Sequence, residues 1–278
     1  MTISVQTNAS ALVALQNLNK TNTDLAAAQD RISTGLAINN AKDNASVWAI
    51  AQGQRADVNS LTAVKASLDR ASSIADVAMT AGASISDLLN EIKAKVVAAQ
   101  DPSLDTTSRN AINTDFRALL RQISDAVNNA QFDGANVLNG SLAPGIQFLA
   151  NADATSFITL ASQDLSLGST SGIITITANA DILTSATASL VLTQIATSIA
   201  NVNAALGNLG SQAKQIEAHN TFISKLSDVL ESGISNLVDA DMAKEAARLQ
   251  ALQVRQQLGV QALSIANSAP QIILSLFK

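Results

Sequence analysis

The sequence contains no cysteine and no tyrosine, and it has only one tryptophan, one histidine and three prolines in 278 residues. The lack of cysteine excludes disulfides, thiol nucleophiles and zinc–thiolate sites. Aromatic residues make up 3% of the chain, so Ala, Leu, Ile and Val must build its core. Such a core suits closely packed helices better than a ligand pocket, which usually has aromatic walls. The scarcity of proline leaves room for long, uninterrupted helices.

Basic residues are also few. There are 17 Lys and Arg against 22 Asp and Glu, which gives a net charge of −5 and a pI near 4.8. Because the basic residues are scattered, the chain carries no footprint for nucleic-acid phosphates. We therefore expect no nucleic-acid partner. The N-terminus does not show the basic start and apolar core of a secretory signal. No run of about 18 apolar residues is present, so we expect no membrane insertion either.

Apolar residues recur at alternating spacings of three and four along several segments, as at the contacting positions, or seam, of a coiled coil. The clearest case covers residues 61–99, where every seam position is apolar or Gly. Pro102 ends this helix, and a second stripe over 112–130 predicts an antiparallel helical hairpin. A third stripe covers 192–237 and loses its register at Asp241. We interpret this phase change as a domain boundary inside one nearly continuous helix.

The two ends of the chain have thinner stripes. Asn22 and Gln29 take seam positions near the N-terminus, and Gln256 and Gly259 do so near the C-terminus. Neither end has enough apolar surface to form a stable helix alone, since isolated helices depend on packing. We therefore expect the ends to pair with each other, to remain mobile in the monomer and to become ordered on assembly.

Residues 133–188 break the helical pattern and predict a small β-rich insert. Turn dipeptides punctuate this segment, namely Asp133-Gly134, Asn139-Gly140 and Pro144-Gly145. Between and after the turns lie short runs with strand character, at residues 146–149, 157–160 and 173–177.

No set of residues points to catalysis, a cofactor or a metal. His219 lies in a helical register without the partners of a catalytic triad, so we interpret it as a polar helix residue. Asp239, Asp241 and Glu245 could act as acid–base groups, but at a register break they more readily cap a helix and complement its dipole.

Two motifs at opposite ends of the chain resemble those of bacterial flagellins. The first is Arg31-Ile32-Ser33-Thr34-Gly35-Leu36, followed by Ala41-Lys42-Asp43. The second opens with Asp239-Ala240-Asp241 and ends with Leu274-Ser275-Leu276-Phe277. Because both motifs occur in the right order, the resemblance is more specific than a single heptad run, and it covers approximately residues 1–140 and 190–278.

The resemblance implies a mainly α-helical fold of long coiled-coil bundles formed by the N- and C-terminal segments, with a small β-rich insert. We expect an inner terminal domain of residues 1–40 and 238–278, an outer helical bundle of 41–132 and 189–237, and a variable insert of 133–188. The expected self-association seam consists of Leu15, Leu18, Leu25, Ile32, Leu249, Leu252, Leu263 and Ile273. The expected joint between the domains consists of Gly35, Lys42, Asp43 and Trp48.

The resemblance also implies a function: a non-enzymatic subunit of the extracellular flagellar filament, used for swimming. Such chains are exported unfolded through a type III channel and polymerise with copies of themselves. The implied further partners are the flagellar cap and junction proteins, the export apparatus and a chaperone.

Three alternatives differ from this hypothesis. A hook–filament junction protein has similar ends but caps the polymer. A small enzyme could occupy the insert, whose carboxylates are only Asp133, Asp153, Asp164 and Asp181 and which has no His or Cys. A secreted adhesin-like coiled coil would leave the double terminal match unexplained.

One stretch departs from flagellins that the animal innate immune receptor senses. Those flagellins carry arginines and a glutamate where this chain has Lys93, Lys95 and Val96. We therefore expect weak recognition by that receptor.

Overall fold

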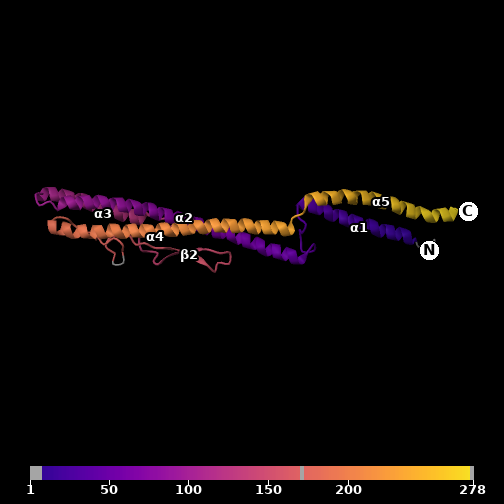
Figure 1. Ribbon diagram of the computed structural model, residues 1–278, viewed down its shortest axis with the longest axis horizontal. Coiled ribbons are helices and arrows are strands. Elements are labelled where there is room, and N and C mark those ends of the chain that lie inside the picture. Colours follow the sequence, from indigo (N-terminus) through magenta and orange to yellow (C-terminus); the bar gives the residue numbers. More distant parts are fainter. Residues whose placement is uncertain (1–7, 170–171, 276–278) are drawn as a thin grey trace. The chain divides into compact units, whose positions relative to one another are not determined.

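The computed structural model describes residues 8–169 and 172–275. Within them the chain forms long helices and one small sheet (Figure 1), so the mainly α-helical fold class predicted from the sequence is confirmed. The elements in chain order are α1 (Ala9–Thr34), α2 (Ala45–Ala99), α3 (Thr106–Asn129), β1 (Gly145–Leu149), β2 (Phe157–Ala161), α4 (Ser185–Val238) and α5 (Met242–Ser275).

The chain divides into two compact units. The terminal unit combines residues 1–56 with 229–278, and the central unit comprises residues 57–228. The insert belongs to the central unit because its backbone bonds to the helices: the amide of Leu149 donates to Ser67 on α2 over 3.2 Å, and that of Ala161 to Gln212 on α4 over 2.9 Å. The sequence predicts three parts with boundaries that differ from those of these two units, and that division stays a prediction.

The core of the central unit follows the seam of α2. Every seam position predicted between residues 61 and 99 is buried, which confirms this part of the pattern. Phe116 and Ile123 of α3, and Ile195 and Leu209 of α4, are equally enclosed. Burying one such side chain contributes about 1.5–3 kcal/mol, so this repeated stripe is the main source of stability in the unit.

The helices α2 and α3 form the predicted antiparallel hairpin. The Asp105 carboxylate accepts a hydrogen bond from the amide of Ser108 over 2.9 Å and so caps the start of α3. Hydrogen bonds from Ser108 lower the pKa of this carboxyl group. Across the hairpin, Lys95 Nζ lies 2.7 Å from Asp115 Oδ2.

Helices α2 and α4 approach closely at Gly82. A Cβ at this position would lie only 2.5 Å from Cδ2 of Leu206 on α4. By contrast, a Cβ at the exposed Gly207 of α4 would meet no heavy atom within 4 Å. Glycine at position 82 therefore lets the two helices lie against each other without displacing Leu206.

The two strands of the insert pair antiparallel, with Gly145 opposite Ala161 and Leu149 opposite Phe157. The first two predicted strands are thus confirmed to within one residue. The turn at Asp133 and Gly134 has positive φ at both residues, as its sequence predicts.

The third predicted strand, residues 173–177, is wrong. Side chains of α4 bind the backbone of this segment instead of a neighbouring strand. The amide of Thr175 donates to Ser198 Oγ over 3.1 Å, and Asn201 Nδ2 donates to the carbonyl of Ile173 over 3.2 Å. Ile174 and Ile176 are still fully buried. The apolar pattern therefore correctly predicted that this segment belongs to the core, but it did not predict which groups its backbone would bond to.

By length and composition alone, α4 could cross a membrane, since one 18-residue window has a mean hydropathy of 1.3. The sequence has no unbroken apolar run of that length, so no such segment is expected from it. The core helix of a helical bundle passes the same test, and α4 places Ile195, Val202 and Leu209 in the core of the central unit.

The close contact at Gly82 predicts that Gly82→Val destabilises the central unit by about 1–3 kcal/mol, because the added atoms overpack the interface. The same change at the open position, Gly207→Val, should be neutral or slightly stabilising, since valine forms helices better than glycine. Urea unfolding followed by circular dichroism measures both. Equal effects of the two substitutions would contradict the close packing at Gly82.

Candidate self-association surface

In the terminal unit, α1 and α5 pair antiparallel (Figure 1), which confirms the expected pairing of the two ends. The order of contacts gives the direction. Asn8 Nδ2 donates to the carbonyl of Ala266 over 2.7 Å near one end of the pair. Arg31 Nη1 lies 3.2 Å from Glu245 Oε1 near the other. Residues far apart in the sequence are thereby held side by side.

The seam between these helices is partly polar. Gln256 Nε2 donates to Asn22 Oδ1 over 2.8 Å, so two polar seam residues found by the sequence analysis meet each other. One turn away, a Cβ on Gly259 would lie 3.2 Å from Leu18 Cδ1, which shows that the helices approach closely there. Polar seam pairs reduce the stability of a coiled coil but fix its register.

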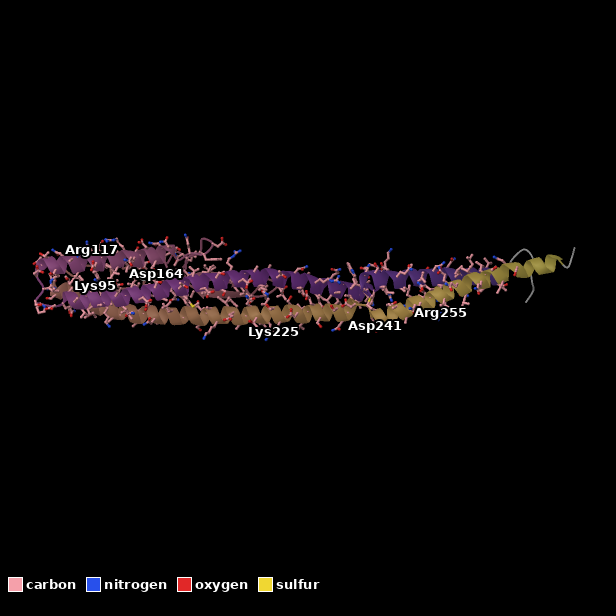
Figure 2. The ribbon with its side chains drawn as sticks, turned by 90° about the horizontal axis from the view of Figure 1, so that it is seen from above. Lys95, Arg117, Asp164, Lys225, Asp241 and Arg255 are labelled. Atoms are coloured by element: carbon pink, nitrogen blue, oxygen red, sulfur yellow. The ribbon has the colours of Figure 1, made fainter. Side chains whose placement is uncertain are left out.

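A buried carboxylate ties the start of α5 to the end of α1. The Glu245 side chain is nearly enclosed and is paired with Arg31, while Arg248 Nη1 lies 3.8 Å from Glu245 Oε1. Glu245 also lies in the first turn of α5, where its charge complements the helix dipole. Asp241 caps the same helix, because its Oδ1 accepts a hydrogen bond from the amide of Lys244 over 3.1 Å. The capping interpretation is confirmed for Asp241, which Figure 2 labels beside the start of α5. Asp239 does not cap α5; its amide donates to the carbonyl of Ser235 at the end of α4.

Helices α4 and α5 are separate, so the nearly continuous helix expected from the sequence is wrong. α4 ends at Val238 and α5 begins at Met242. At this break the chain binds the segment that follows α1 instead of continuing the helix. The carbonyl of Val238 accepts hydrogen bonds from Ala37 and Ile38, and the amide of Ala240 donates to Gly35 over 2.8 Å.

Gly35 ends α1 in the left-handed conformation, with φ of 74°. This conformation favours glycine and lets the Gly35 amide donate to the carbonyl of Arg31 over 2.9 Å. Of the other expected joint residues, Asp43 accepts hydrogen bonds from the amides of Asn39 and Asn40. Lys42 is exposed and Trp48 is half-buried. The role of these four residues at the joint between the domains stays a prediction.

The expected seam residues differ in burial. Leu252 is buried, and five others are half-buried: Leu18, Leu25, Ile32, Leu249 and Leu263. Leu15 is 42% exposed. The side chain of Ile273 lies outside the described residues. The self-association role of the set is not tested by these positions and stays a prediction.

The paired helices leave large apolar side chains in solvent. On α1 these are Leu12, Val13 and Leu15, and on α5 they are Met242, Val254, Leu258, Val260 and Ile265. We call this set the terminal apolar surface. The only apolar side chains of the two helices that are fully enclosed among the described residues are Ala28 and Leu252. Of this surface, only Leu15 belongs to the self-association seam expected from the sequence, because the other residues lie outside that seam.

The three residues at which this chain departs from receptor-sensed flagellins differ in exposure. Lys93 is exposed, whereas Val96 is 0% exposed and cannot contact another molecule while α2 is packed. Lys95 is held by Asp115, whose hydrogen bond raises the pKa of the lysine.

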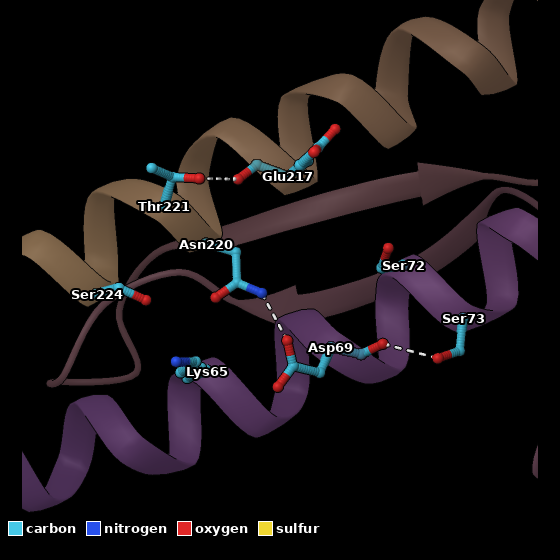
Figure 3. Close-up of a pocket in the computed structure, with 8 residues that line it drawn as sticks. All are labelled: Lys65, Asp69, Ser72, Ser73, Glu217, Asn220, Thr221 and Ser224. Carbon is cyan, nitrogen blue, oxygen red and sulfur yellow. Dashed lines mark hydrogen bonds between the residues drawn. The ribbon is translucent and has the colours of Figure 1, made fainter.

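Nothing in the described residues forms a metal site, since no group of three or more His, Asp or Glu lies close enough together. His219 Nε2 donates to the carbonyl of Ala150 over 2.7 Å, which is a structural contact. A polar groove beside it, between α2 and α4, contains the hydrogen bond from Asn220 Nδ2 to Asp69 Oδ1, 2.6 Å long (Figure 3). Lys65 and Glu217 also line this groove, together with serine and threonine side chains.

Comparisons with known proteins match both helical regions. A family model described as the bacterial flagellin N-terminal helical region matches residues 5–143, and one for the C-terminal helical region matches residues 192–277. Flagellin FljJ of Caulobacter vibrioides is 55% identical over 100% of this chain and 99% of that protein. The flagellin of Brucella melitensis is 40% identical over 99% of each chain. The crystal structure of Bacillus cereus flagellin covers 55% of this chain and 86% of that chain, with 22% identity and a TM-score of 0.48.

The contact between Arg31 and Glu245 predicts that Arg31→Ala loosens the α1–α5 pair, because it leaves a buried carboxylate with only the more distant Arg248. We expect a loss of about 1–3 kcal/mol, measured as faster amide hydrogen exchange in the first turns of α5 in assembled filaments, where these amides are protected. Adding Glu245→Gln to the Arg31→Ala variant removes the buried charge and should restore part of the protection. If Arg31→Ala changes exchange no more than Lys95→Ala in the central unit, the contact is not a stabilising one.

Proposed function

The chain belongs to the bacterial flagellin family, and from this membership we propose how it assembles. It is a structural subunit of the extracellular flagellar filament and polymerises with copies of itself. We propose that the subunits join through the terminal apolar surface of α1 and α5. The domain and seam assignments made from the sequence are part of this proposal, with Leu15 as the expected seam residue that also belongs to the exposed surface.

The observation that carries the proposal is the exposure of this surface. Ile265 is 70% exposed, and Val254 and Leu258 are each more than half exposed. Enclosing the rest of one such side chain contributes about 1 kcal/mol. A surface of several neighbouring residues is needed to offset the loss of translational and rotational freedom on association. The two helices supply such a surface on adjacent elements.

The same features support export of the chain in an unfolded state through the flagellar type III channel. The chain has no cysteine, so no disulfide has to be broken before it is threaded. A polar seam also makes the terminal helices easy to separate. A chaperone would then cover α1 or α5 before export, and the cap protein would guide their pairing at the tip of the filament.

The proposal predicts that the purified chain forms long helical filaments, seen by electron microscopy, and that a variant lacking residues 241–278 forms none. The truncated chain should keep the melting transition of its central unit, because the core of residues 57–228 does not include α5. Short stubs in place of long filaments would favour a hook–filament junction protein. Normal filaments from the truncated chain would refute the proposal.

A matched pair of point variants separates the surface from the loss of chain length. Ile265→Glu places a charge on the terminal apolar surface and should prevent polymerisation. Gln261→Glu places the same charge on an exposed polar position of α5 and should leave polymerisation intact. Equal effects of the two changes would argue against this surface.

Recognition by the animal innate receptor should be weak. Lys93 and Lys95 stand where sensed flagellins carry other charged residues, and Lys95 is already paired with Asp115. In a cell reporter assay, we expect the purified monomer to give much less response than a flagellin that the receptor senses. A full response would contradict this expectation.

A further inference from the structure

A groove of about 400 Å³ runs between α2 and α3 in the central unit. Its apolar lining consists of Val77, Ala81, Ala126 and Ala130. The side chains of Asp76, Thr80, Ser84 and Asn129 complete the lining and are exposed. We call it the α2/α3 groove. Its apolar residues are small, so a larger apolar side chain from outside can enter between the helices.

A side chain of that kind projects from α4. Phe222 is 55% exposed, more than any other aromatic residue that the structure describes as exposed, and its ring lies 5.8 Å from that of His219. One turn further along α4, Lys225 is exposed too; Figure 2 labels it. Phe222 and Lys225 together present an apolar ring beside a positive charge.

The charges of the two features are complementary. The groove carries the carboxylate of Asp76 at its edge, and Asp125 of α3 is exposed next to the groove residue Ala126. Among the ion pairs of the described residues, none includes Asp76 or Lys225. Lys225 can therefore reach an acidic groove edge without giving up a partner in its own chain.

Phe222 cannot fill the groove of its own chain. Asn220 contacts Asp69, so this part of α4 lies level with Asp69 on α2. Ala81, in the middle of the groove, is twelve residues further along α2, which corresponds to about 18 Å of helix. The occupant must come from another molecule.

We propose that Phe222 of one subunit inserts into the α2/α3 groove of a second copy of this chain, with Lys225 beside Asp76 of that copy. The contact rests on the proposed assembly and adds a second interface to it, in the central unit. It joins two different surfaces, and a heterologous contact of this type generates open helical polymers rather than closed dimers. That is the symmetry a filament requires.

The pairing is tested on the unaltered protein with a zero-length carbodiimide, which joins a carboxylate to an amine with loss of water. Filaments are grown from equal amounts of unlabelled and ¹⁵N-labelled chain, and crosslinked peptides are identified by mass spectrometry. We expect a peptide joining Asp76 to Lys225 with one labelled and one unlabelled half, present in filaments and absent from monomers. Lys95 and Asp115, 2.7 Å apart within one chain, give the internal control in both states.

Filaments in which the control pair is crosslinked but Asp76 and Lys225 are not would overturn this inference and leave the terminal surface untouched. A crosslink whose halves always carry the same label would overturn it as well. If the unaltered chain formed no filaments at all, the proposed assembly would fail, and this contact with it.

A pair of substitutions tests the apolar part of the contact. Phe222→Ala should raise the critical concentration for polymerisation about tenfold, the factor that corresponds to 1.4 kcal/mol. Phe157→Ala removes a ring that is 48% exposed on β2 and should leave the critical concentration unchanged. Equal changes for both variants, or no change for Phe222→Ala, would contradict the insertion of this ring.

Discussion

The structure depends above all on the weak contact between α1 and α5 in the terminal unit. The two helices pair with each other, yet their contact encloses very little apolar surface. Ala28 and Leu252 are the enclosed apolar side chains of these helices among the described residues, while residues such as Ile265 remain in solvent. In the central unit, by contrast, α2 buries an unbroken stripe of apolar side chains. The two units therefore differ in where their stabilising contacts lie. The central unit contains its own, and in the proposed assembly the terminal unit obtains them from other subunits.

Polar contacts give the terminal unit its register without giving it much stability. The pairs Asn22–Gln256 and Arg31–Glu245 set which residues of α1 and α5 face each other. A buried ion pair is roughly offset by the cost of removing its charges from water, so its main effect here is to disfavour other alignments. The backbone bonds at Gly35 then fix where α1 ends and α5 begins. In the proposed assembly, a pair that is correctly aligned but weakly held separates for export and pairs again in the filament.

The parts of this fold that repeat could be predicted from the sequence, and the parts that depend on single contacts could not. The seam of α2 was predicted at every position because a long run of apolar residues at regular spacing has one simple solution. The third strand was wrong because the hydrogen bonds between residues 173–177 and the side chains of Ser198 and Asn201 leave no local signal in the sequence. A domain boundary near the break between α4 and α5 was predicted from the loss of register at Asp241, but the backbone partners of this break lie near Gly35, at the other end of the chain. Most of the terminal apolar surface was missed for a similar reason, since heptad analysis finds the face between paired helices and not the opposite one.

Amide hydrogen exchange of the monomer and of the filament tests the central claim most directly, because it reports the local stability of each helix. The account predicts that amides of α1 and α5 exchange rapidly in the monomer and become protected by several orders of magnitude in the filament. Amides on the buried face of α2 should be protected in both states. Equal protection of α1, α5 and α2 in the free monomer would show that the terminal pair is stable without its neighbours, and would contradict the account.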